Sequence, residues 1–241
     1  MFTYSRTIIF VLVCSGLAAC AAPAPSPEAG AEDARRVDAS GVTYRDGTVR
    51  IIEYSAPRVD LKGAPRLGSP AARIGIVEFS DYQCLYCRDF HRKQFMRIRQ
   101  EYIDTGLVQF IHRDLPLKMH PHAVTAAVAA RCARAQGRFW DMHDALFDNQ
   151  GRLGADLYAK LARQLKLDEA KFSACLDDRT QSQAIARDLS VAKRLGFTGT
   201  PSFLIGTIEG DTLTVAREAR GAMEFEMFAR DIEKLRQPPS R

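Results

Sequence analysis

The chain has 241 residues, of which 46% are hydrophobic and 26% are charged. This composition can bury a substantial core, so we expect one domain with an insertion or two small domains. The net charge of +5 comes from basic residues spread along the chain without a long basic run, which argues against a nucleic-acid-binding protein.

Residues 1–19 predict an export signal. Arg6 lies in a short polar start, residues 7–19 are mostly apolar, and small residues precede Cys20. This order resembles a bacterial lipobox, which implies cleavage before Cys20, a lipid anchor on that residue and, with Ala21 next, no retention at the inner membrane. Ordinary signal cleavage and an uncleaved span remain alternatives, although the apolar stretch is shorter than the roughly 20 residues that a bilayer needs.

Two short segments precede the expected domain. Residues 20–41 are rich in Ala, Pro and small or acidic residues and hold few bulky apolar side chains, which predicts a flexible tether. Residues 42–62 contain Asp46-Gly47, a two-residue turn signal inside a partly alternating stretch, which predicts a small N-terminal hairpin or extension.

Four cysteines remain once the signal and the lipidated Cys20 are set aside, namely Cys84, Cys87, Cys132 and Cys175. An even number of cysteines in an exported chain predicts disulfide pairing, because the compartment is oxidising.

Cys84 lies where a predicted strand, residues 73–80, turns into a predicted helix. Cys87 lies one helical turn later on the same face. Unpaired backbone N–H groups and the helix dipole favour an anion at the helix start, so the pKa of Cys84 should be lowered and Cys84 is the expected nucleophile. A static bridge or half of a zinc site are the alternatives, but a second ligand pair of matching spacing is absent from the sequence.

The rest of the chain predicts two halves of a sheet with helices between them. The apolar spacing of residues 120–192 is helical almost throughout. The other predicted elements are a second strand parallel to the first (residues 107–117), a third strand opened by Pro201 (199–206), its hairpin partner (212–220) and a final helix (224–236).

This order, with the cysteine pair at the first helix and Thr200-Pro201 before the third strand, resembles the thioredoxin fold, an α/β fold, here with an inserted all-helical subdomain. The segments GAPRLG, IVEFSDYQCLYC, QGRFWDMHDALFDNQ and GFTGTPSFLIG, in this order, resemble the DsbA-like thiol-disulfide oxidoreductases. The likeness divides the chain into a first half (63–118), the helical insertion (119–194) and a second half (195–237). Leu85 stands where many relatives have proline, so a relative's redox potential cannot be carried over.

The resemblance implies that Cys84 exchanges disulfides with unfolded or folding exported proteins and that Cys87 resolves the mixed disulfide. It also implies a cis bond before Pro201, which leaves the main chain of Thr200 beside Cys84 to pair with an extended substrate. A quinone-linked DsbB-like membrane oxidase would be the redox partner, and no cofactor, metal or nucleic acid is expected. The implied location is the periplasmic side of the envelope, lipid-anchored, at the outer rather than the inner membrane.

Glu78 is the odd residue in its apolar strand. If that strand is covered on both sides, the carboxylate is buried beneath the disulfide with a raised pKa and could shuttle the proton of Cys87. A solvated glutamate at the strand end is the alternative.

Cys132 and Cys175 lie in the middle of predicted helices. They predict a structural disulfide contributing about 3 to 4 kcal/mol, with two buried free thiols as the alternative.

The five histidines are scattered along the sequence. His91 follows Cys87 by one turn and could influence the thiolate, although a solvated helix histidine is commoner. A copper or zinc carrier built on Cys84, Cys87 and His91 is the competing function, and the Thr200-Pro201 element argues against it. A disulfide isomerase or reductase kept reduced by a membrane donor is the other alternative. Residues 21–62 are too short and polar for a dimerisation domain, so we favour a monomeric oxidase.

Overall fold

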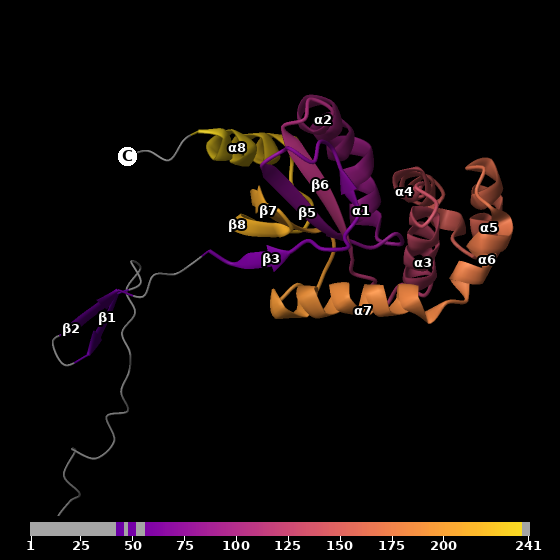
Figure 1. The fold of residues 1–241 in the computed structure, drawn as a ribbon, viewed down its shortest axis with the longest axis horizontal. Helices are drawn as coiled ribbons and strands as arrows, with labels where there is room; N and C mark the ends of the chain where they lie inside the picture. The colour runs from indigo at the N-terminus through magenta and orange to yellow at the C-terminus, as the bar shows by residue number, and fades with distance from the viewer. Residues whose placement is uncertain (1–41, 46–47, 52–55, 238–241) are drawn as a thin grey trace, which may run out of the picture. The chain divides into compact units, whose positions relative to one another are not determined.

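The computed structural model describes residues 42–45, 48–51 and 56–237 (Figure 1). The predicted signal, Cys20 and the tether lie outside the described residues. The chain divides into two units, Met1–Tyr54 and Ser55–Arg241, and each is described by itself. In the first unit β1 (Val42–Arg45) and β2 (Thr48–Ile51) pair antiparallel, which is the pairing expected of a hairpin there.

Within residues 56–237, six strands form one sheet in the order β3-β8-β7-β5-β6-β4. The strands are β3 (Arg58–Asp60), β4 (Arg66–Leu67), β5 (Ile74–Ser80), β6 (Val108–Asp114), β7 (Ser202–Glu209) and β8 (Thr212–Arg220). β5 and β6 are parallel, as predicted, and the other neighbouring pairs are antiparallel. β3 lies inside the segment that we expected to be an extension, but it pairs with β8 and so belongs to the sheet.

Helices cover both faces of this sheet (Figure 1). On one face lie α8 (Phe225–Arg236) and the long helix that follows β5, where α1 (Leu85–Phe90) continues through η1 (His91–Phe95), α2 (Met96–Ile98) and η2 (Arg99–Ile103). α7 (Arg179–Arg194) covers the other face. β5 and β6 are buried along their whole length because they lie between these two layers. None of the helices in the described part of the chain has the length and apolarity needed to span a bilayer.

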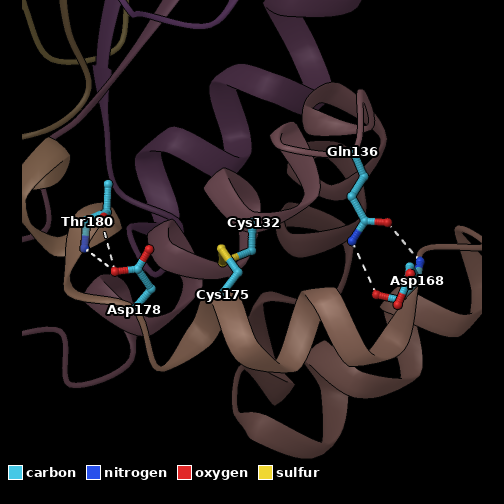
Figure 2. The surroundings of a disulfide bond; sticks show 6 residues. All are labelled: Cys132, Gln136, Asp168, Cys175, Asp178 and Thr180. Carbon is cyan, nitrogen blue, oxygen red and sulfur yellow. Dashed lines mark hydrogen bonds between the residues drawn. A yellow bond between two sulfur atoms is a disulfide. The ribbon is translucent and has the colours of Figure 1, made fainter.

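The insertion between β6 and β7 is helical, as predicted, and has its own apolar core. Its elements before α7 are α3 (Ala123–Arg134), α4 (Phe139–Asp148), η3 (Gln150–Arg152), α5 (Ala155–Gln164) and α6 (Glu169–Leu176). A disulfide between Cys132 and Cys175, with an S–S length of 2.04 Å, joins α3 to α6 (Figure 2). Nearby, the Gln136 amide accepts from the Asp168 N–H at 2.8 Å and donates to the Asp168 carbonyl at 3.2 Å (Figure 2).

Buried ion pairs connect the insertion to the sheet. Arg131 on α3 donates to Asp114 on β6 at 2.5 Å and also to Asp188 on α7. Arg113 on β6 donates to the second oxygen of Asp188 at 2.5 Å. These four side chains are almost completely buried, so each charge depends on its partners and the network fixes α3 and α7 against β6.

Candidate active site

The turn after β5 positions Cys84. Cys84 is the N-cap of α1, with extended backbone angles φ −76° and ψ 123°. The Asp81 carboxylate accepts from the Gln83 N–H at 2.7 Å, and its carbonyl accepts from the Cys84 N–H at 3.1 Å. The Gln150 amide of the insertion donates to the carbonyls of Tyr82 and Cys84 at 2.9 and 2.8 Å. Sequence reasoning missed Gln150, because nothing in its local pattern marks a side chain that reaches a turn far away in the sequence.

Cys84 is a free thiol whose pKa is lowered to about 6. The largest cause is a hydrogen bond from the Cys87 thiol, which outweighs the opposing effect of burial. Thr200 and the backbone groups of Tyr86 and Cys87 in the first turn of α1 lower the pKa of Cys84 further. The lowered pKa of Cys84 therefore agrees with a cysteine at a helix start, but the neighbouring Cys87 thiol lowers this pKa more than the first-turn backbone does.

Cys87 has the opposite perturbation. It is fully buried, and this burial raises its pKa well above the ordinary value. The hydrogen bond to Cys84 and the negative charge of Glu78 act in the same direction. At neutral pH the pair therefore holds one thiolate, on Cys84, and one thiol, on Cys87, which is the arrangement of a nucleophile and a resolving cysteine.

The peptide bond between Thr200 and Pro201 is cis, and it lies beside Cys84. The Cys84 Sγ lies 3.4 Å from the Thr200 carbonyl oxygen. A shallow groove borders this contact and is lined by Tyr86, Thr198 and Gly199, among others. Tyr86 is 68% exposed, so an apolar surface flanks the thiol.

A second, mostly apolar groove meets the first at Thr198. Its lining includes Leu117, Met119, Leu189 and Phe197, and Met119 is 77% exposed. Apolar grooves of this kind favour extended, apolar polypeptide segments as ligands.

Glu78 on β5 is fully buried, as predicted, but its pKa is lowered rather than raised. Burial alone would raise the pKa of Glu78, yet the charge and hydrogen bond of His91, with smaller effects of His112 and His143, outweigh it. The His91 Nε2 lies 3.3 Å from Glu78 Oε2, and the Ser80 hydroxyl donates to Oε1 at 2.8 Å. The prediction of a raised pKa was wrong because the histidine partners could not be seen in the sequence.

Three of the five histidines gather around Glu78. The ring centroid of His143, on α4, lies 4.4 Å from that of His91 and 5.2 Å from that of His112. His91 is buried, not solvated as expected, because its ring stacks at 4.3 Å on Phe147 of the insertion. Burial, followed by the charge of His91, lowers the pKa of His143 to about 3.

These positions bear on the metal carrier considered above. His91 turns toward Glu78, at 3.3 Å. Among the described residues, the two groups of side chains close enough to share a metal ion contain histidine and carboxylate ligands but neither cysteine. The geometry therefore does not support a carrier built on Cys84, Cys87 and His91.

Comparison with known proteins places this site in a wider context. The sequence model of the family described as Thioredoxin matches residues 60–221. The structure of alpha-DsbA1 from Wolbachia pipientis is 29% identical and covers 73% of this chain and 92% of that chain with a TM-score of 0.64. The predicted fold class, a thioredoxin-like α/β fold with a helical insertion, is therefore confirmed.

Two curated relatives cover smaller shares of the chain. Disulfide bond formation protein D of Bacillus subtilis is 29% identical over 160 residues, which is 60% of this chain and 68% of that protein. The Na(+)/H(+) antiporter NhaA 3 of Salinispora tropica is 35% identical over 139 residues, 57% of this chain. The matched part is only 21% of that antiporter's length.

Proposed function

The chain belongs to the thioredoxin family, and from that premise we propose that it is a protein thiol-disulfide oxidoreductase of the bacterial cell envelope that oxidises cysteines of exported proteins. One observation carries the proposal: Cys84, the N-cap of α1, has a lowered pKa, whereas Cys87, buried in the first turn of the same helix, has a raised pKa. The similarity to a disulfide bond formation protein supports it.

The oxidation step follows from these pKa values. A substrate thiolate attacks the Cys84 sulfur of the Cys84–Cys87 disulfide, the enzyme S–S bond breaks, and Cys87 leaves and takes up a proton. A second substrate thiolate then attacks the substrate sulfur of the mixed disulfide and releases Cys84 as a thiolate. The substrate loses two electrons and the enzyme becomes a dithiol. The low pKa of Cys84 favours the direction of substrate oxidation, because it stabilises the reduced enzyme.

Substrate binding is proposed at the Thr200 main chain and the two grooves. The Thr200 carbonyl beside Cys84 offers a main-chain contact that reads no particular side chain, which suits many unfolded clients. Leu85, 60% exposed, and Tyr86 follow Cys84 directly and supply apolar contact near the thiol, and Met119 supplies it in the second groove. A membrane oxidase could use the same surface to reoxidise the enzyme, and we propose a quinone-linked DsbB-like protein as that partner.

We propose that Glu78 takes up and returns the proton of Cys87 by way of the Ser80 hydroxyl. The Ser80 hydroxyl lies between the two groups: it donates to Glu78 Oε1 at 2.8 Å when Cys87 is a thiol, and a hydrogen bond to Cys87 has a minor lowering effect on the pKa of that cysteine. His91 holds Glu78 in its charged form, so Glu78 can accept the proton of Cys87 only briefly, and its lowered pKa favours return of that proton when Cys87 leaves.

The location of the protein is proposed from its N-terminal sequence. A lipid on Cys20 would hold the domain at the periplasmic side of the envelope, at the outer membrane, with residues 20–41 as the tether. Incorporation of a labelled fatty acid checks this directly. Label that is present in the unsubstituted protein and lost in Cys20→Ser supports the lipid anchor. Equal labelling of the unsubstituted protein and the variant contradicts it.

A glutathione titration of the Cys84–Cys87 pair tests the direction of the activity. We expect a reduction potential above that of the glutathione pool. A reduction potential like that of thioredoxin, about −270 mV, would contradict an oxidase and favour the isomerase or reductase. The double variant Cys84→Ser, Cys87→Ser serves as the control, because any titration that remains in it comes from cysteines outside the active-site pair.

A further inference from the structure

Four buried side chains from four different elements converge inside the domain. They are Glu78 of β5, His91 of η1, His112 of β6 and His143 of α4. His143 belongs to the helical insertion, whereas Glu78 and His112 belong to the sheet. The proposed disulfide exchange uses Glu78 but gives no role to His112 or His143.

In His112 and His143, one ring nitrogen is hydrogen-bonded to a neighbouring carboxylate. The His112 Nε2 lies 3.1 Å from Asp114 Oδ1, and the His143 Nδ1 lies 3.0 Å from Asp144 Oδ1. A carboxylate only accepts hydrogen bonds, so we assign the ring hydrogens to these two nitrogens. The opposite nitrogens, His112 Nδ1 and His143 Nε2, then present lone pairs.

Those two nitrogens are buried and have no hydrogen-bond partner among the described residues. One ligand atom each of Glu78, His112 and His143 lies within 4.8 Å of the other two. Buried acceptors without a donor cost free energy, and a proton donor or a cation among these three side chains would remove that cost. The arrangement therefore calls for a positively charged or proton-donating occupant.

We propose that Glu78, His112 and His143 bind one divalent transition-metal ion of the zinc type. Two imidazole nitrogens and one carboxylate oxygen suit Zn²⁺, Co²⁺ or Cu²⁺ better than Mg²⁺ or Ca²⁺, which prefer oxygen ligands. Metal-binding histidines usually donate their second N–H to a carboxylate, as His112 and His143 do to Asp114 and Asp144.

Binding of the ion requires the three ligand side chains to move closer together. Zinc bonds of about 2.0 to 2.2 Å place tetrahedral ligand atoms about 3.4 Å apart, so the three side chains must move together by up to about 1.4 Å. A second possible set, His91, His143 and Asp144, also falls within 4.8 Å. In that set His143 and Asp144 already bond each other at 3.0 Å, so we prefer the set that contains Glu78.

The proposed ion would join the insertion to the sheet. His143 lies on α4, and the other two ligands lie on β5 and β6, so the metal cross-links two parts of the chain that otherwise pack through side chains. A ligand that binds only the folded protein at 100 times its dissociation constant lowers the unfolding constant about 100-fold. Metal should therefore raise the unfolding midpoint. The site shares Glu78 with the proton path proposed for Cys87, but the experiments below measure bound metal and stability, so they test it separately from the oxidase activity.

The test uses the untagged protein in its oxidised form, so that Cys84 and Cys87 cannot bind metal. The protein is refolded with Zn²⁺ or Co²⁺, because the site is closed in the folded state, and free metal is then removed. We expect one ion per chain by elemental analysis, visible absorption bands of tetrahedral Co²⁺ and a higher unfolding midpoint with metal. A chain that retains no metal overturns the proposal and leaves a bridging water as the occupant.

Substitutions locate the ion. His112→Gln, His143→Gln and Glu78→Gln should each reduce the bound metal at least tenfold, whereas His122→Gln, at an exposed histidine, should retain one ion per chain. Equal metal in all four variants would contradict the site. Loss in His91→Gln but not in Glu78→Gln would overturn the ligand assignment in favour of the second set. If a variant does not fold, the Co²⁺ spectrum of the unsubstituted protein still decides between nitrogen and oxygen ligands.

Discussion

The hydrogen bond between the two active-site thiols should control the reactivity of Cys84. It is the largest cause of the lowered pKa of Cys84, so removing the donor at Cys87 should raise that pKa. Cys87→Ala removes the donor, and Cys87→Ser is the matched control because its hydroxyl can still donate. A hydrogen bond to a charged group is worth about 1.5 to 3 kcal/mol, which corresponds to roughly 1 to 2 pKa units.

The magnitude can be followed at neutral pH. With a pKa of about 6, Cys84 is about 90% thiolate at pH 7, whereas an ordinary cysteine with a pKa near 8.5 is about 3% thiolate. Cys87→Ala should lower the thiolate fraction at pH 7 to roughly 10 to 50%, and Cys87→Ser should remain near the unsubstituted value. Ultraviolet absorbance of the thiolate and the alkylation rate, both measured against pH, give the two midpoints. Identical midpoints for the Ala and Ser variants would refute the role of this bond.

The same pKa makes the stability of the reduced protein depend on pH. The folded pKa of Cys84 lies below the unfolded value, so the unfolded chain binds more protons between pH 6 and 8.5. The contribution is fully present above about pH 8.5 and is lost as the pH falls through 6. At pH 7 it amounts to at most about 1.4 kcal/mol before solvent screening. The oxidised protein should lack this dependence, which denaturant unfolding of both forms can measure.

Three further outcomes are expected. Cys87→Ala should accumulate mixed disulfides through Cys84 with exported proteins, because the resolving thiol is gone; recovery of no thiol-sensitive adducts from cells would contradict this. Replacing Cys132 and Cys175 with Ala should lower the free energy of unfolding by about 4 kcal/mol for a loop of 43 residues. The rate of oxidation of a thiol peptide should stay the same, and a large fall in that rate would show that the bridge serves catalysis. Arg131→Met should destabilise the protein by about 3 to 5 kcal/mol, since two buried carboxylates lose a partner, and unchanged denaturant unfolding would show that the network contributes little.

The sequence predicted the parts of the site that depend on local structure. A short β-rich run followed by helical spacing placed Cys84 at a helix start, and Cys84 is the N-cap of α1. The parallel pairing of β5 with β6 followed from the strand, helix and strand order. These features depend on residues close together in the chain, whose periodicity and turn signals can be read directly. The apolar spacing predicted the helix that follows Cys84, but it did not indicate the π-helical turns at η1 and η2.

The tertiary structure alone decided the electrostatics. The sequence indicated that Glu78 could be buried, but the direction of its pKa depends on His91, His112 and His143, which come from three other elements. Burial and charge act over a few ångströms of space, whatever the separation along the chain. Gln150 likewise reaches the active-site turn from the insertion. The sequence by itself therefore determined the fold and the reacting cysteines, and the packing of the insertion on the sheet determined which buried groups surround them.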